Sequence, residues 1–323
     1  MKIVITDHGF PSIEQEQRLF AAAGCELVVL QSKDPAVLRT ACRDADALLV
    51  QWAPIDKDTI ASLAHCKAIV RYGIGVDSVD LAAAGARGIP VCNIPDYCID
   101  EVANHALALA LGLARQVPQT DAAVRGGTWK IFPPSPFPAF RTTTFATVGF
   151  GRIARAVLER ARVFGFKLAA YDPFVQPAAF AAAGVRQVDV SELWSEAGIV
   201  SLHLPLNAQT KHILGRSALA QMRSDAIVVN TARGGLIDTV ALAEALHERK
   251  IAGAGLDVFE VEPLPNDHPL RLAPNLVLTS HTAWYSGGSV PELQRKCAEA
   301  VVRAIRGEPL VNVVNSAFLS PTP

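Results

Sequence analysis

A glycine-rich turn between a short apolar run and a helical stretch constrains the fold of this chain more than any other feature. The turn is Gly149-Phe150-Gly151-Arg152-Ile153-Ala154; it follows the run 145–148 and opens a helical pattern over 152–164. In a mononucleotide-binding βαβ unit the first glycine makes the turn, the second lets the backbone approach a pyrophosphate, and the third small residue lets helix and strand pack closely. Because similar turns occur in proteins that bind no nucleotide, the pattern needs support from elsewhere in the chain.

An acidic residue at the end of the next apolar run supplies that support. The run 167–171 ends in Asp172, which lies close to the spacing of about 20 residues at which a carboxylate meets the adenosine ribose. Pro173 and Phe174 follow it, with no nearby Arg or Lys for a 2′-phosphate. The spacing therefore predicts NAD as the cofactor, with Arg152 as a cation beside the pyrophosphate and Ile153 in the same groove.

Short β-rich runs alternate with helical patterns on both sides of this turn. The first half has such runs at 2–6, 26–30, 47–51, 68–71 and 90–93. Six runs belong to the second half, at 145–148, 167–171, 199–203, 226–230, 252–258 and 275–279. This alternation predicts an α/β protein with two doubly wound, parallel-sheet domains of Rossmann-like type. The first half has no phosphate-type glycine turn after its first run, so we expect it to form a substrate domain.

The connecting segments carry their own signals. The stretch 100–116 predicts a helix that is apolar nearly all round, which must be covered on more than one side. The segment 117–141 is rich in proline and is predicted to be an arm or linker without regular structure. A capping-box pattern at Ser289–Glu292 predicts a last helix that ends at Gly307. We expect this helix to return to the first domain.

Composition limits the partners and the location. A formal net charge of −1 over 323 residues gives no electrostatic case for binding nucleic acid or an anionic membrane, so a small molecule is the expected partner. The six cysteines lack a C-x-x-C pair, and the first apolar run is too short for a secretory signal, which together predict a cytoplasmic protein with free thiols. No metal is expected, because six of the histidines show no spacing typical of metal ligands. We interpret these six as structural or exposed: His8, His65, His105, His212, His247 and His268.

Three polar side chains follow three predicted strands at their carboxyl ends, where doubly wound sheets bind ligands: Arg233, Glu262 and His281. Each alone could be structural, as a surface ion pair, a turn residue or a cap. Together they suit the reduction of a carbonyl by a nicotinamide cofactor. His281 would give a proton to the carbonyl oxygen, and Glu262 would hydrogen-bond the other imidazole nitrogen. Arg233 would bind the carboxylate of the substrate.

The segments Val228–Asp238, Gly255–Pro263 and Ser280–Trp284 resemble the signature segments of the NAD-dependent D-2-hydroxyacid dehydrogenase family. The resemblance implies an enzyme that interconverts a small 2-keto acid and a D-2-hydroxy acid with NAD(H). It implies a flavodoxin-like substrate domain of residues 1–99 and 286–323 around an NAD-binding Rossmann domain of residues 100–285. It also implies a homodimer in which the apolar helix and the arm after it cover the partner.

The same resemblance implies roles for individual residues. It gives Arg233, Glu262 and His281 the catalytic roles described above, and it places Asp257 against the nicotinamide amide. The segment Tyr72–Asp77 resembles the loop whose backbone N–H groups meet the substrate carboxylate, and its middle residues are Ile74 and Gly75. The remaining cofactor-binding residues implied are His203, Pro205, Thr210, Thr231 and Ala232.

Two residues resemble the C-terminal-binding-protein branch of the family and its bacterial relatives more than the glyoxylate or phosphoglycerate enzymes. Arg71 would be a second cation for the substrate carboxylate, and Trp284 an apolar wall; a surface cation and core packing are the alternatives. The branch leaves open a second function, that of a dinucleotide-responsive binding or corepressor-like protein with incidental dehydrogenase activity. A phosphorylated substrate would need cations near residues 51–54, and that loop contains none.

Overall fold

The computed structural model describes residues 1–131 and 137–319 of the chain. The chain divides into two compact units, Met1–Cys98 with Tyr285–Pro323, and Ile99–Trp284. Each unit is a parallel sheet covered by helices on both faces, so the predicted α/β class with Rossmann-like sheets is confirmed. None of the helices in the two described ranges has the length and apolar character needed to cross a bilayer.

The sheet of the first unit has the strand order β2-β1-β3-β4-β5, which is the flavodoxin-like order. All of its neighbouring strands are parallel. The predicted strands are all present; β4 has the predicted bounds, and the other four are one or two residues shorter than predicted. The bounds are β1 (Lys2–Ile5), β2 (Glu26–Val29), β3 (Ala47–Val50), β4 (Ala68–Arg71) and β5 (Val91–Cys92).

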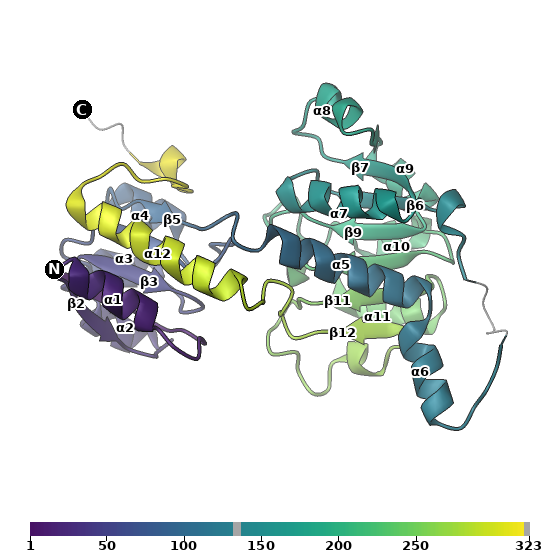
Figure 1. Ribbon diagram of the computed structural model, residues 1–323, viewed down its shortest axis with the longest axis horizontal. Coiled ribbons are helices and arrows are strands. Elements are labelled where there is room, and N and C mark those ends of the chain that lie inside the picture. The colour runs from purple at the N-terminus through teal and green to yellow at the C-terminus, as the bar shows by residue number, and fades with distance from the viewer. Residues whose placement is uncertain (132–136, 320–323) are drawn as a thin grey trace. The chain divides into compact units, whose positions relative to one another are not determined.

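Helices cover both faces of this first sheet (Figure 1). On one face, α1 (Glu14–Ala22) lies beside the last helix, α12 (Ser289–Arg306), which also packs on β3 and β4. The final helix thus belongs to the first unit. The other face buries Leu38, Ile60 and Ala84, which come from three short helices: α2 (Pro35–Ala41), α3 (Lys57–Ser62) and α4 (Leu81–Ala86).

The ends of α12 test the capping prediction. Gly307 ends the helix with φ +70°, as expected. The capping box is wrong, because Gly288 is the N-cap and Ser289 is the first helical residue. The hydroxyl of Ser289 instead accepts a hydrogen bond from the amide of Ser286, before the helix begins. A serine one position inside the helix therefore produced the same sequence pattern as a true cap.

The sheet of the second unit has seven strands within the described residues, one more than predicted. Their order is β12-β11-β10-β9-β6-β7-β8, the dinucleotide-binding order with β12 added at one edge. The unpredicted strand, β8, is two exposed residues long and is marked by no apolar run. The bounds are β6 (Thr144–Val148), β7 (Lys167–Tyr171), β8 (Arg186–Gln187), β9 (Ile199–Leu202), β10 (Ile227–Asn230), β11 (Gly253–Leu256) and β12 (Leu276–Leu278).

Helices lie on both faces of this second sheet (Figure 1), and an apolar core is buried under each face. One face is covered by α5 (Ile99–Ala114), α7 (Arg152–Val163) and α8 (Pro177–Ala182). Because α5 packs on both α7 and the strands β10 and β11, most of its surface is covered, which agrees with its apolar character. The other face carries α9 (Val190–Glu196), α10 (Arg216–Gln221) and α11 (Thr239–His247), which begins behind the predicted N-cap Asp238.

The predicted arm begins with regular structure instead of a linker. Residues Val117–Arg125 form helix α6, with Pro118 in its first turn, where a proline costs no hydrogen bond. The prediction of irregular structure is therefore wrong for this part of the segment. Of the four prolines that motivated it, Pro133, Pro134 and Pro136 lie outside the described residues, and Pro138 lies in backbone without helix or strand, as predicted.

Candidate active site

Polar residues gather at one edge of the second sheet. Because the neighbouring strands are all parallel, the segments that follow β6, β7, β9, β10, β11 and β12 leave the sheet at the same edge. The strands β6 and β9 are neighbours in this sheet. From β6 the chain continues to β7 on one side, and from β9 it continues to β10 on the other side. Such a switch point is where doubly wound sheets bind ligands.

The glycine turn after β6 has the geometry that its sequence predicts. Gly149 has φ +103°, and a Cβ on it would lie 2.5 Å from the backbone oxygen of His203, so only glycine fits. Gly151 caps α7 and has no described atom within 4 Å of the place where its Cβ would be. Ala154 is fully buried where helix and strand pack. The turn therefore leaves open backbone at a helix start, as a phosphate group requires.

Asp172 follows β7 and supports the same turn. Its Oδ2 accepts a hydrogen bond from the amide of Phe150 at 2.9 Å, and its Oδ1 accepts from the amide of Phe174 at 3.0 Å. The carboxylate therefore lies beside the glycine turn, where the sequence predicts a ribose contact. Arg152 is exposed and Ile153 half-buried in the first turn of α7.

The segment after β9 holds a neutral histidine. The Nε2 of His203 is 2.8 Å from the hydroxyl of Ser201, and burial lowers the pKa of His203 to about 4. Farther along, the hydroxyl of Thr210 donates to the backbone oxygen of Pro205 at 2.7 Å and accepts from the amide of Asn207 at 2.8 Å. These bonds fix the shape of the loop that was predicted to bind the cofactor.

A buried amide that the sequence analysis missed shapes the segment after β10. The Oδ1 of Asn230 accepts from the amide of Ala232 at 3.0 Å, and its Nδ2 donates to the backbone oxygen of Arg233 at 2.8 Å. The hydroxyl of Thr231 is buried and has no hydrogen-bond partner among the described residues. A polar residue that ends an otherwise apolar strand was the sequence signal for Asn230.

The loop of Arg233 packs directly on the loop of Glu262. A Cβ on Gly234 would lie 1.9 Å from the carbonyl carbon of Phe259. Only a glycine therefore lets the backbones of the two loops lie in contact. The Nη1 of Arg233 donates to the backbone oxygen of Ala232 at 2.7 Å. The guanidinium is close enough to Glu262 to favour ionisation of that carboxyl group.

Glu262 and His281 form a hydrogen-bonded pair, with His281 Nδ1 at 2.7 Å from Glu262 Oε2. Burial alone would raise the pKa of Glu262. The bond from His281 and its charge, the bond from the amide of Phe259 and, last, the charge of Arg233 outweigh burial, so the pKa lies below the ordinary value. The ionised carboxylate can only accept, so Nδ1 carries a proton and Nε2 is the nitrogen that exchanges a proton with a ligand. The side chain of His281 is 38% exposed and that of Glu262 is 34% exposed, so a ligand can reach both.

Asp257 secures the loop that carries His281. Its side chain is fully buried, and its oxygens accept from the amides of Thr282 and Ala283, each at 2.9 Å, and from the hydroxyl of Thr279 at 2.5 Å. Its backbone oxygen accepts from the amide of His281. The contact of Asp257 with a nicotinamide amide stays a prediction, whereas its support of this loop is a feature that the sequence analysis missed.

Four further residues, Trp284, Arg71, Ile74 and Gly75, are those predicted to contact the substrate. The Nε1 of Trp284 donates to the backbone oxygen of His281 at 2.9 Å. Arg71 ends β4, and its Nη1 lies 1.6 Å from where a Cβ on Gly73 would be, so the guanidinium lies against the loop. Ile74 and Gly75 are half-buried in that loop. Contact of these four predicted residues with a substrate stays a prediction.

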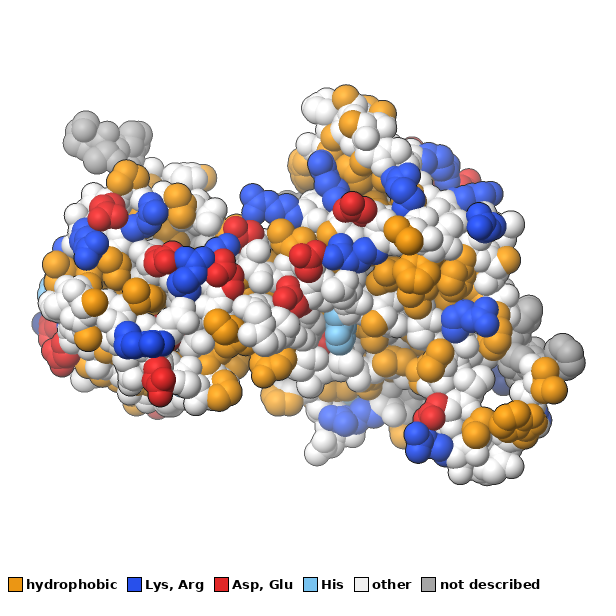
Figure 2. All heavy atoms as spheres, in the orientation of Figure 1, with side chains coloured by type: hydrophobic (Ala, Val, Ile, Leu, Met, Phe, Trp, Pro, Cys, Tyr) orange, Lys and Arg blue, Asp and Glu red, His pale blue; other side chains and the backbone are white. Residues whose placement is uncertain are grey.

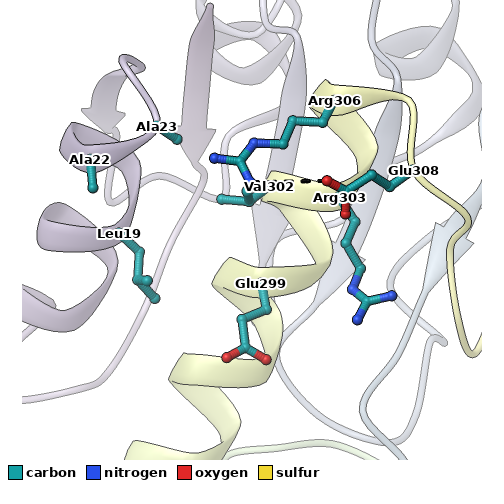
Figure 3. Close-up of a pocket in the computed structure, with 8 residues that line it drawn as sticks. All are labelled: Leu19, Ala22, Ala23, Glu299, Val302, Arg303, Arg306 and Glu308. Carbon is teal, nitrogen blue, oxygen red and sulfur yellow. Dashed lines mark ion pairs between the residues drawn. The ribbon is translucent and has the colours of Figure 1, made fainter.

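A concavity elsewhere in the first unit does not include these residues. It is a cavity of about 290 Å³ between α1 and α12, with apolar walls and charged rims (Figure 3). Figure 3 shows Arg306 and Glu308 paired at one end of it. Among the residues in the described ranges, no cluster of three or more His, Cys, Asp or Glu side chains could hold a metal ion.

Comparison with known proteins establishes the family. Residues 107–283 match the family model described as the D-isomer specific 2-hydroxyacid dehydrogenase, NAD binding domain. The chain belongs to this family, and the second unit contains its NAD-binding domain.

Two curated relatives are similar over most of the chain. A D-3-phosphoglycerate dehydrogenase of Methanocaldococcus jannaschii is 38% identical over 98% of this chain and 59% of its own length. A glyoxylate reductase of Thermococcus litoralis is 38% identical over 90% of this chain and 91% of its own length. The chain thus spans little more than half of the phosphoglycerate dehydrogenase. The finer placement in the C-terminal-binding-protein branch stays a prediction.

A solved structure shares the whole fold. An acyclic imino acid reductase, Bsp5, solved in complex with NADPH and D-Arg, superposes with a TM-score of 0.87 and is 30% identical. The match covers 97% of this chain and 100% of that one.

Proposed function

We propose that this protein is an NAD-dependent D-2-hydroxyacid dehydrogenase that interconverts a small 2-keto acid and the D-2-hydroxy acid. The observation that carries the proposal is the hydrogen-bonded pair of Glu262 and His281, beside the loop of Arg233, at the same sheet edge as the glycine turn. A pure binding protein has no need of an acid–base histidine paired with an ionised carboxylate.

The side chains divide the work of carbonyl reduction. NADH, when bound, supplies the hydride that reaches the carbonyl carbon of the substrate. His281 starts as an imidazolium and transfers its Nε2 proton to the carbonyl oxygen, so the product is the 2-hydroxy acid. Glu262 keeps its hydrogen bond to Nδ1 throughout and stabilises the positive charge of the ring before transfer. Arg233 binds the substrate carboxylate through its planar guanidinium.

The residues around the turn suit NAD. Two features fit a bound dinucleotide: the open space at Gly151, and the buried hydroxyl of Thr231, which finds no hydrogen-bond partner in the described part of the chain. We assign Arg152 to the pyrophosphate and Asp172 to the ribose, where its negative charge disfavours a 2′-phosphate. The rest of the groove would come from Ile153, His203, Pro205, Thr210, Ala232 and Asp257.

On the substrate side we assign Arg71, Ile74 and Gly75 to the substrate carboxylate, and Trp284 to the side chain. The structure adds one cation that the sequence analysis did not expect near residues 51–54. The Nζ of Lys33 lies over Trp52, 5.2 Å from the centroid of its ring, although Lys33 belongs to a different loop of the sequence. A phosphorylated 2-keto acid therefore belongs in the substrate panel beside small unphosphorylated ones.

We also propose a homodimer in the cytoplasm, without nucleic-acid or membrane partners. Figure 2 shows hydrophobic side chains over α5 and around α6. Val124, Trp129 and Ile131 are 52%, 78% and 77% exposed, so one short segment presents three large apolar side chains to a partner. All six cysteines are free thiols, as a reducing compartment permits. Light scattering of the wild type and a Trp129→Ser variant tests the dimer.

The activity is tested by a panel of 2-keto acids with NADH and NADPH. His281→Ala should abolish reduction of every acid while NADH still binds, and His247→Ala, at an exposed position on α11, is the matched control. Retained turnover in His281→Ala would overturn the proposal. If the wild type reduces none of the acids and NADH strengthens its self-association, the binding function replaces the enzyme.

A further inference from the structure

His105 lies behind the candidate active site in a position that its sequence context did not indicate. It projects from α5, and its Nε2 is 2.9 Å from the hydroxyl oxygen of Thr279 and 3.6 Å from Oδ1 of Asp257. Its side chain is 25% exposed, whereas Asp257 is fully buried. The sequence predicts only a structural or exposed position for His105, because it lacks metal-ligand spacing to another histidine.

The hydrogen bonds in this group run in one direction. Thr279 donates its single hydroxyl proton to Oδ1 of Asp257 at 2.5 Å, so toward His105 its oxygen can only accept. His105 must therefore carry its proton on Nε2. The result is a chain of two donated bonds, from His105 to Thr279 and from Thr279 to Asp257.

The end of this chain is the carboxylate that shapes the loop of His281. The oxygens of Asp257 accept the amides of Thr282 and Ala283, on the C-terminal side of His281. His281 itself has φ +55°, a conformation that a residue with a side chain adopts only when its surroundings impose it. Any rotation of the carboxylate would release the bonds that impose it.

We propose that His105 and Thr279 are positioning residues for the acid–base histidine. They hold the Asp257 carboxylate in the one orientation that bonds both loop amides, and they thereby fix the imidazole of His281 for proton transfer. Neither residue touches a substrate in this scheme. The inference rests on the proposed dehydrogenase function for its kinetic consequence, but its structural consequence is independent of catalysis.

Two pairs of variants test the proposal. Thr279→Val and His105→Leu remove the hydrogen bonds and keep the approximate shape, whereas Thr279→Ser and His105→Gln keep a hydroxyl and an Nε2 donor. His247→Leu on α11 is a histidine control at an exposed position. For each folded variant we would measure kcat and KM for the best keto acid, and hydrogen–deuterium exchange over residues 280–284.

We expect kcat to fall about tenfold in Thr279→Val and in His105→Leu, while KM stays nearly constant. Thr279→Val loses the bond to the Asp257 carboxylate, and His105→Leu loses the bond that orients the Thr279 hydroxyl. Exchange over 280–284 should become about tenfold faster in the same two variants. The Ser, Gln and His247→Leu variants should stay within about threefold of the wild type in both measurements, by the same hydrogen-bond energies. Rescue by Ser and Gln distinguishes positioning from mere packing.

Two outcomes would overturn the inference. One is unchanged exchange over 280–284 in both Thr279→Val and His105→Leu. The other is an equal loss in the Ser and Gln variants, which would show that packing and not hydrogen bonding matters. A wild type that reduces no keto acid would refute the proposed function alone, because the exchange measurement still decides whether His105 and Thr279 hold the loop.

Discussion

The backbone oxygen of His203 occupies the place where a side chain on Gly149 would begin, 2.5 Å from the ideal Cβ position. The contact follows from the sheet, because Val148 of β6 pairs with Leu202 of β9 and the next residue of each strand leaves at the same edge. The glycine at the switch point is therefore required by a neighbouring strand as well as by its own φ of +103°.

Gly149→Ala should destabilise the protein by about 3 kcal/mol, since it adds a backbone clash to a left-handed conformation. Gly151→Ala is the matched control two residues away, where φ is −75° and the Cβ position is open. This second variant should change the free energy of unfolding by less than about 0.5 kcal/mol and still weaken NADH binding, because its methyl group stands where the backbone meets the pyrophosphate. Urea unfolding and NADH fluorescence titration measure the two effects. Equal destabilisation of both variants would contradict the account.

Much of this fold could be predicted from local patterns. Apolar runs located all but one of the strands, because a strand buried on both faces is a continuous apolar segment. The short exposed strand β8 has no such run, and helix α6 was hidden by prolines that lie farther along the segment. In both cases the sequence pattern of a whole segment was misleading. The strand β8 is too short to produce an apolar run, and the prolines that follow α6 do not interrupt the helix itself.

The candidate site could be predicted only in part. The positions of Glu262 and His281 after parallel strands predicted that they share an edge, and the structure shows the bond between them. The support given by Asn230 and Asp257 depends on hydrogen bonds to amides several residues away, or on other strands. Sequence spacing does not encode such partners, because they are brought together by the register of the folded sheet.

Glu262→Gln should lower kcat about a hundredfold and leave the KM for the keto acid nearly unchanged. The amide can still bond to Nδ1 of His281, but it cannot stabilise the imidazolium that begins the reduction. Steady-state kinetics at saturating NADH measures both constants. A rise in KM with unchanged kcat would mean that Glu262 contacts the substrate directly and would contradict its role beside the histidine.

Asp172→Asn should weaken the preference for NADH over NADPH by about tenfold, since it removes a negative charge that repels a 2′-phosphate. The asparagine keeps an oxygen for the amide of Phe150, so the glycine turn should hold its shape. The ratio of kcat/KM values for the two cofactors is the measurement, and an unchanged melting temperature is the control. A wild type that prefers NADPH would contradict this interpretation of Asp172.

Burial of His203 should make the stability of the protein depend on pH in acid. Its pKa of about 4 lies below the ordinary value of 6.5, so between these values the unfolded chain binds a proton that the folded protein does not. Stability therefore falls as the pH decreases from 6.5 to 4, by up to about 3 kcal/mol. His203→Gln does not titrate and keeps an Nε2 group near Ser201, so urea unfolding at pH 7 and pH 4.5 should show a smaller difference in this variant than in the wild type. Equal differences would show that His203 is protonated in the folded protein.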